Sequence, residues 1–157
     1  MKAWHYTTGD HVVAIKASGV LKTSTGLVPN MQKPVLWFSL NHCWEQTANK
    51  CWSDGMGNTR GLDMAETGAR CGGPVRIGIE AEGLLRSDQL RHAADIGRVW
   101  WRDLCSIGIK NVASPDDWLG HVGELVGLGP HARDFGQRVA GCWRTNKFNG
   151  LRASASR

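Results

Sequence analysis

The sequence predicts one α+β domain over residues 1–157, built on a small, mostly antiparallel sheet flanked by short helices. Three observations predict this class. Apolar residues make up 41% of the chain and charged residues 21%, as in a globular protein with a packed core. Twenty glycines favour many turns and short elements over a helical bundle. Short apolar runs alternate along the chain with helix-like segments, without an internal repeat or a linker.

The first part of the chain is predicted to hold two strands, each followed by a helix, at residues 2–6, 11–18, 35–40 and 44–50. Asp10 is suited to begin the first helix and Gly19 to end it, and Val12 and Ile15 face the core. Pro34 precedes a continuous apolar run, so we expect the second strand to be covered on both faces.

Residues 51–73 are predicted to form a long irregular stretch, because six glycines interrupt any regular period. Loops of this length in a compact domain are usually functional or mobile. Apolar and polar residues alternate over 75–79, which predicts a half-buried strand. The remaining predictions are a long helix over 88–104, short elements over 118–126, a helix from His131 and a last strand over 139–143.

Charge, cysteine content and hydrophobicity predict the solubility and the cellular compartment of the protein. The net charge of +5 attracts anions, but the basic residues are scattered, so we interpret the excess mainly as a contribution to solubility. Five cysteines without a CxxC pair favour reduced thiols in a cytoplasmic protein. No signal-peptide core or apolar run of membrane length is present, so we expect no membrane partner.

Neither metal nor phosphate motifs take a regular form in this sequence. The candidate zinc ligands match no ligand spacing, and we therefore expect no metal; they are His42, Cys43, Cys51, Cys71 and His92. The glycine-rich segment 55–61 lacks a preceding apolar strand and the Gly-Lys-Ser/Thr sequence of a phosphate loop. Arg60 or Arg70 could still bind a pyrophosphate if this loop closes over a ligand.

Polar side chains lie among aromatic ones in the first two predicted strands. The residues concerned are His5, Tyr6 and Thr7 of the first strand, Trp37, Phe38 and Ser39 of the second, and Trp44 and Glu45 just after it. If the two strands are neighbours, an imidazole and a hydroxyl face a shared cleft with an aromatic wall, which suits a flat polar ligand. The alternative is that the aromatics are plain core and Glu45 only complements a helix dipole.

One acidic residue of the last third has unusual neighbours. Glu124 lies in the segment Gly120-His121-Val122-Gly123-Glu124-Leu125-Val126, where glycines permit close approach of a ligand. A carboxylate there could bind a ribose diol and stabilise a developing oxocarbenium ion. The alternative is a glutamate on a surface turn.

The order of these pieces resembles the ADP-ribosyltransferase-like superfamily, in the branch that opens with a His-x-Thr strand. The resemblance lies in residues 4–48 and includes the turn 17–21 (Ala-Ser-Gly-Val-Leu). It implies a compact split sheet that uses NAD as co-substrate and needs no metal. His5 and Thr7 would correspond to contacts with nicotinamide and ribose, Phe38-Ser39 to the polar position of the second strand, and Glu124 to the late catalytic glutamate.

The resemblance implies cleavage of the nicotinamide–ribose bond of NAD and transfer of ADP-ribose to a protein or nucleic-acid acceptor. His5 and Glu124 would be the catalytic residues, and we expect an accessory factor of a bacterium or phage that modifies a host target. Two other hypotheses stay open. One is a non-catalytic module on the same fold that binds a nucleotide or a protein and acts by occupancy. The other is a nucleic-acid-binding protein that uses the basic C-terminal stretch.

Overall fold

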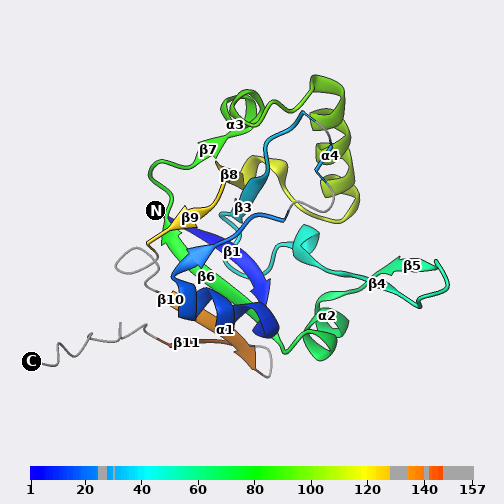
Figure 1. The fold of residues 1–157 in the computed structure, drawn as a ribbon, viewed down its shortest axis with the longest axis vertical. Coiled ribbons are helices and arrows are strands. Elements are labelled where there is room, and N and C mark those ends of the chain that lie inside the picture. The colour runs from blue at the N-terminus through cyan, green and yellow to red at the C-terminus, as the bar shows by residue number, and fades with distance from the viewer. Residues whose placement is uncertain (25–27, 30, 128–133, 140–141, 147–157) are drawn as a thin grey trace, which may run out of the picture.

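The computed structural model describes residues 1–24, 28–29, 31–127, 134–139 and 142–146. A seven-stranded antiparallel sheet forms its centre (Figure 1). Its strands are β1 (Lys2–Thr8), β3 (Val35–Ser39), β6 (Pro74–Glu80), β7 (Leu85–Arg86), β8 (Trp118–Val122), β10 (Asp134–Val139) and β11 (Cys142–Asn146), in the order β11-β10-β6-β1-β3-β8-β7. The predicted α+β class with an antiparallel sheet is confirmed.

Smaller elements surround this sheet. The helices are α1 (Gly9–Ser18), α2 (Met64–Arg70), α3 (Ser87–Ala93) and α4 (Arg98–Lys110), with short 3₁₀ turns η1 (Gln46–Ala48) and η2 (Pro115–Asp117). Two further strand pairs are β2 (Val20–Leu21) with β9 (Leu125–Val126), and β4 (Cys51–Ser53) with β5 (Thr59–Gly61). Within the described ranges, no helix combines the length and the apolar character that crossing a bilayer requires.

The sheet is split between β1 and β3. Strand β1 pairs with β6 along its whole length, and β3 pairs with β8 over all five of its residues. In contrast, β1 and β3 pair only where Trp4 lies opposite Ser39. The two halves of the sheet therefore meet at the last residue of β3, and farther back along β3 the carbonyl of Trp37 meets the side chain of His5 instead of the main chain of β1.

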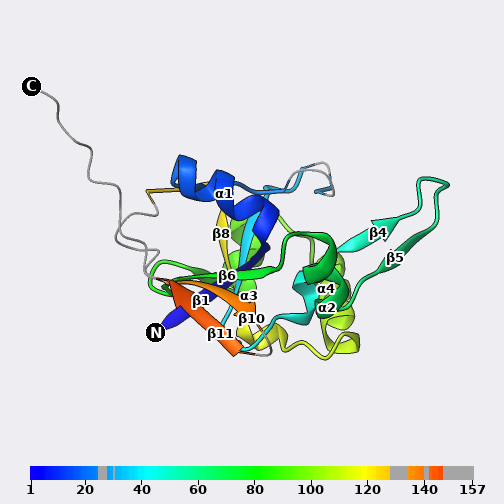
Figure 2. The same ribbon diagram turned by 90° about the horizontal axis from the view of Figure 1, so that it is seen from below.

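The core lies between the sheet and α1, which Figure 2 shows on one side of the sheet. Its fully buried members are Ala3, Leu21, Leu36, Phe38, Ile77, Ile79 and Leu119. Val12 and Ile15 of α1, both half-buried, pack against them, as predicted. Gly19 ends α1 in the left-handed conformation (φ 66°), and its N–H donates to Ile15.

The predicted irregular stretch over residues 51–73 is wrong. Strands β4 and β5 form a hairpin that projects from the body in both views (Figures 1 and 2), which we call the β4–β5 arm (residues 51–61). Helix α2 follows and begins with a capping box, in which Asp63 accepts from the N–H of Glu66 and Glu66 accepts from the N–H of Asp63. Because every residue of β4 and β5 is exposed, these strands lack the apolar alternation that reveals a strand in a sequence.

Several other boundaries differ from prediction. The expected helix over 88–104 is two helices, α3 and α4, separated by a turn in which Asp95 has a positive φ of 56°. The expected helix over 44–50 is only the turn η1. The expected last strand over 139–143 is wrong, because β10 ends at Val139 and β11 begins at Cys142 as its antiparallel partner. The start of the helix expected from His131 lies outside the described residues.

Candidate functional site

Two neighbouring cavities lie at the split between β1 and β3. The first has a volume of about 350 Å³ and is lined by residues of β1, β3, η1, α4 and β8. The second has a volume of about 540 Å³ and lies among β1, α1, β3 and the residues after β2. His5, Tyr6 and Trp37 line both cavities, so these residues border both spaces.

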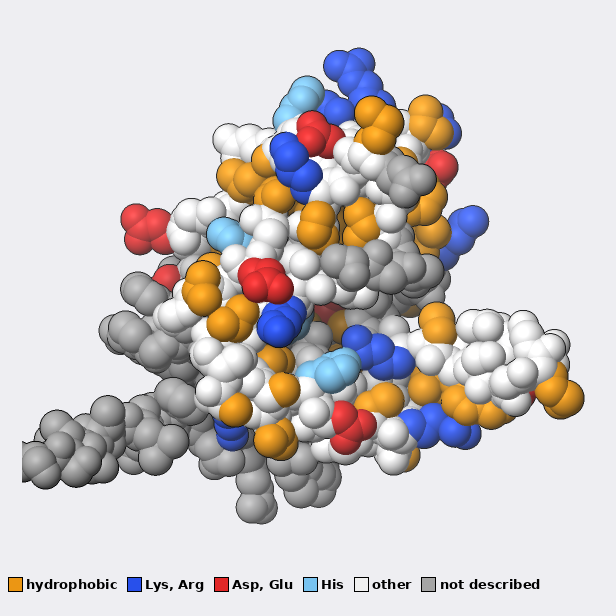
Figure 3. Space-filling model, in the orientation of Figure 1, with side chains coloured by type: hydrophobic (Ala, Val, Ile, Leu, Met, Phe, Trp, Pro, Cys, Tyr) orange, Lys and Arg blue, Asp and Glu red, His pale blue; other side chains and the backbone are white. Residues whose placement is uncertain are grey.

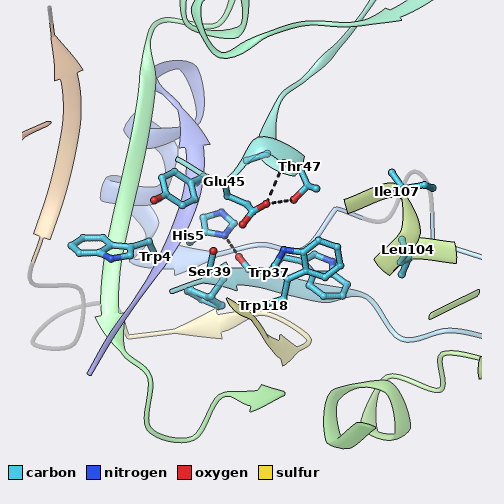
Figure 4. A pocket seen from close by; sticks show the side chains of 12 residues that line it. Trp4, His5, Trp37, Ser39, Glu45, Thr47, Leu104, Ile107 and Trp118 are labelled. Atoms are coloured by element: carbon cyan, nitrogen blue, oxygen red, sulfur yellow. Dashed lines mark hydrogen bonds between the residues drawn. The ribbon is translucent and has the colours of Figure 1, made fainter. Parts of the chain in front are cut away.

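Aromatic side chains form much of the wall of the first cavity (Figure 4). Trp37 is 37% exposed, and its ring meets the edge of Trp118 with the ring centroids 6.0 Å apart. On another side, Trp37 stacks on Trp101 of α4 at 6.3 Å. Leu104 and Ile107 bring α4 to the same cavity. The wall suits a flat ring, and stacking on Trp is most favourable when the ring carries positive charge.

The indole of Trp118 fixes how closely α4 approaches the sheet. A Cβ atom on Gly108 would lie 2.4 Å from Cη2 of Trp118, so this helix position has no room for a larger residue. Trp118 is 8% exposed, and its buried Nε1–H has no hydrogen-bond partner among the described residues. Such an unsatisfied buried donor costs about 1–3 kcal/mol and is uncommon in folded proteins.

Glu45 places a buried carboxylate at the first cavity. Only 7% of Glu45 is exposed. Its Oε1 accepts hydrogen bonds from the hydroxyl of Thr47 at 2.9 Å and from the N–H of Thr47 at 3.3 Å. Its Oε2 accepts none from the described residues. Figure 4 shows this carboxylate and the imidazole of His5 reaching toward the same space. One oxygen is thus held by the protein, and the other can bind a ligand.

The loop that carries Glu45 is itself fixed by hydrogen bonds. The amide of Asn41 donates to the carbonyl of Trp44 at 2.9 Å, and the indole N–H of Trp44 donates to Asn49 at 2.9 Å. The hydroxyl of Tyr6 donates to the carbonyl of Asn41, and its ring meets Trp44 edge-on at 5.1 Å. Burial is the main cause that raises the pKa of Tyr6, which therefore stays a neutral donor.

His5 stands where β1 and β3 separate. Its Nδ1 lies 2.9 Å from the carbonyl oxygen of Trp37, and because a carbonyl only accepts, Nδ1 carries the proton. Burial lowers the pKa of His5 most strongly, and the positive charges of Lys50 and His11 lower it further, against the opposing effect of the Trp37 hydrogen bond. A neutral imidazole with a protonated Nδ1 offers Nε2 as a hydrogen-bond acceptor.

The second cavity has a different electrostatic character. Its lining includes Lys22, Lys50, His11 and the hydroxyl of Thr7. No Asp or Glu is among the described residues that line it. The first cavity carries the carboxylate of Glu45, whereas the second carries only neutral and basic groups, so the two differ in the charge that they attract.

The structure brings most of the predicted site residues to the split. Its first cavity is lined by five of them together with Glu45: His5, Tyr6, Trp37, Phe38 and Ser39. Thr7 lines the second cavity, and Trp44 lines neither but supports the Glu45 loop. Glu124 is exposed on the turn between β8 and β9 and lines neither cavity.

Sequence reasoning missed Thr47, Lys50 and Trp118 as site residues. A Thr two positions after Glu45 is a signal for a local side-chain hydrogen bond, and it could have identified Thr47. Lys50 and Trp118 reach the cavities only through the tertiary fold, because β8 lies beside β3 and residue 50 follows η1. Within the part of the chain that the structure describes, no three His, Cys, Asp or Glu side chains are grouped as metal ligands would be.

Comparison with known proteins identifies no relative of this chain. The chain matches no protein-family model, and neither a curated protein nor a solved structure is significantly similar to it.

Proposed function

We propose that this protein is an NAD-dependent ADP-ribosyltransferase with an ADP-ribosyltransferase-like fold. The observation that carries the proposal is the pair formed by Glu45 and His5. A buried carboxylate with one free oxygen and an imidazole of lowered pKa line the same aromatic cavity, at the split between β1 and β3. A ligand with a flat cationic ring and ribose hydroxyls fits this combination, and the nicotinamide riboside half of NAD is such a ligand.

The nicotinamide ring would stack on the aromatic wall. The nicotinamide ring of NAD is a cation, and the partly exposed Trp37 lines the cavity beside Trp118. Nε2 of His5 would accept a hydrogen bond from a ribose hydroxyl or from the carboxamide N–H₂. The hydroxyl of Ser39, whose oxygen accepts from the N–H of Asn41 at 3.1 Å, can donate its own hydrogen to the ligand.

The reaction breaks the bond between C1′ of the ribose and the ring nitrogen of nicotinamide. The electron pair of that bond leaves with nicotinamide, which becomes neutral, and positive charge develops on the ribose. The free oxygen of Glu45 would stabilise this charge and accept the proton that the acceptor's nucleophile loses when it attacks C1′. The products are neutral nicotinamide and an ADP-ribosylated acceptor, either a protein or a nucleic acid.

Glu45 takes the role that the sequence analysis gave to Glu124, and the two residues make a matched test. Wild-type protein, Glu45→Gln and Glu124→Gln are incubated with NAD labelled in nicotinamide and with a cell lysate, and released nicotinamide is measured. We expect release by the wild type, about 100-fold slower release by Glu45→Gln, and unchanged release by Glu124→Gln. NAD binding, measured by calorimetry, should survive in both variants.

Other outcomes would overturn parts of the proposal. Loss of release in Glu124→Gln alone would return the catalytic role to Glu124. NAD binding without any release would make the protein a nucleotide-binding module that acts by occupancy. Absence of NAD binding to the wild type would remove NAD as the ligand of the aromatic cavity.

A further inference from the structure

The second cavity has the composition of an anion site. Among its described lining residues, the titratable groups are two lysines, two histidines and Tyr6, and no carboxylate is present. Thr7, Thr23 and Ser24 add hydroxyl groups that can donate hydrogen bonds. Figure 3 shows a histidine and a basic side chain next to each other on this face, between α1 and the base of the β4–β5 arm. Positive charge without a nearby carboxylate favours a ligand of negative charge.

Two hydrogen bonds hold the backbone of Lys50 at this cavity. Its backbone N–H donates to the hydroxyl of Thr67 at 3.1 Å, and its carbonyl accepts from the N–H of Leu62 at 2.8 Å. The residue is half-buried, yet Lys50 forms no ion pair with the described residues. A partly buried cation loses hydration, and a bound anion would offset this cost, so a half-buried lysine at this cavity favours a charged ligand.

The other basic groups come from different elements. Lys22 follows β2, and His11 lies in the first turn of α1, where its Nδ1 is 3.4 Å from the hydroxyl of Thr8. Burial is the main cause that lowers the pKa of His5, and the electrostatic effects of Lys50 and His11 add to it, so both residues lie near His5 at this cavity. Lysine and histidine side chains from three parts of the fold thus line one cavity next to the aromatic one.

We propose that the second cavity binds a phosphate or diphosphate group, with Lys50 and Lys22 as its cationic ligands. This site does not require that NAD is cleaved. Its phosphate has two chemical sources. One is the diphosphate of the dinucleotide whose nicotinamide end occupies the aromatic cavity, which fits because His5 and Trp37 line both spaces. The other is a phosphorylated end of the acceptor.

The experiment measures binding of inorganic pyrophosphate and of ADP by calorimetry at constant ionic strength, with excess sulfate as the control for unspecific anion binding. The variants are Lys50→Met, Lys22→Met and the matched control Lys33→Met. Lys33 pairs with Asp95 at 2.8 Å and lines neither cavity. We expect the wild type and Lys33→Met to bind both probes equally. Lys50→Met and Lys22→Met should each bind about tenfold more weakly, as for the loss of one charge-assisted contact.

Two results would overturn the phosphate site: absence of pyrophosphate and ADP binding to the wild type, or equal affinities in Lys50→Met and Lys33→Met. Competition then identifies the source of the phosphate. Displacement of pyrophosphate by NAD and ADP-ribose assigns the cavity to the donor's diphosphate. Displacement by a 5′-phosphorylated oligonucleotide, but not by NAD, assigns it to the acceptor. Either displacement supports the site, and nicotinamide release by Glu45→Gln tests the proposed reaction separately.

Discussion

The hydroxyl of Thr47 donates to Oε1 of Glu45 at 2.9 Å, and this contact sets the direction of the only carboxylate among the described residues of the aromatic cavity. Thr47 acts on the proposed reaction through Glu45. Thr47→Val keeps the shape of the side chain and removes the donor. We expect kcat for nicotinamide release to fall about tenfold, which corresponds to about 1.4 kcal/mol, while KM for NAD changes little.

The serine variant separates this positioning role from a structural one. Thr47→Ser keeps the hydroxyl and the backbone N–H that also reaches Glu45, so its kcat should stay within about twofold of the wild type. Equal losses in the valine and serine variants would mean that the methyl group of Thr47, and not its hydrogen bond, is what matters. Melting temperatures of both variants exclude a general loss of the fold.

His5 makes ligand binding depend on pH. Its pKa is lowered from 6.5, chiefly by burial, so the imidazole is neutral above pH 6.5 and gains a proton only as the pH falls through that lowered value. Protonation converts the acceptor Nε2 into a donor, and we expect NAD affinity to be constant above pH 6.5 and to fall below it. Calorimetry between pH 5 and 8 measures this, and His5→Gln should remove the dependence.

The imidazole of His5 also makes the free energy of unfolding depend on pH. An unfolded histidine binds its proton near pH 6.5, before the folded His5 does, so the unfolded state gains protons first as the pH falls. The stability that His5 contributes is therefore complete above pH 6.5 and is lost as the pH falls through the lowered pKa. The difference in unfolding temperature between wild type and His5→Gln should be constant above pH 6.5 and change below it, and a difference that stays constant over the whole range would contradict this linkage.

Gly108→Ala should destabilise the protein despite the better helix propensity of alanine. The new Cβ would lie 2.4 and 2.5 Å from two ring carbons of Trp118. Overpacking of this kind costs about 1–3 kcal/mol, against a gain of about 0.5–1 kcal/mol from replacing glycine in a helix. Urea unfolding measures the net loss. Gly61→Ala is the control, because no atom lies within 4 Å of the corresponding Cβ and its stability should be unchanged or higher.

The junction between the β4–β5 arm and α2 should be sensitive to acid. The hydrogen bond from Arg60, followed by the N–H of Asp63, lowers the pKa of Glu66 to about 2 from 4.5. The ionised side chain of Glu66 therefore contributes stability to the folded state. This contribution is complete above pH 4.5 and is lost as the pH falls toward 2. In acid titrations monitored by circular dichroism, Glu66→Gln should show a smaller pH dependence in this range. Glu82→Gln, which changes an exposed residue outside the described ion pairs, should match the wild type.

Local patterns predicted the elements whose residues face the core. Val12 and Ile15 on one face of a helix that Gly19 ends, and the alternation over 75–79, indicated α1 and β6 because burial imposes these periods. The β4–β5 arm escaped prediction because exposure imposes no period on it. A signal for α2 was present, since Asp63 and Glu66 have the spacing of a capping box.

The candidate site was predictable where it follows a strand. His5, Trp37 and Ser39 lie on neighbouring strands, and their strand patterns identified them. The carboxylate was harder to assign, because Glu45 and Glu124 both have suggestive neighbours in the sequence. Only the tertiary fold separates them: the hydrogen-bonded loop after β3 turns Glu45 inward, whereas the turn after β8 leaves Glu124 exposed.

The single residue pair between β1 and β3 has a mechanical consequence. Only one residue pair joins two half-sheets that are each well hydrogen-bonded. A ligand bound between β1 and β3 would contact both half-sheets and hold them together where strand pairing does not. Occupancy should then stiffen the whole domain, and amide hydrogens of both half-sheets should exchange more slowly together. Because β1 and β3 are the most weakly paired neighbours in this part of the sheet, a ligand bound between them can contribute most to the rigidity of the domain.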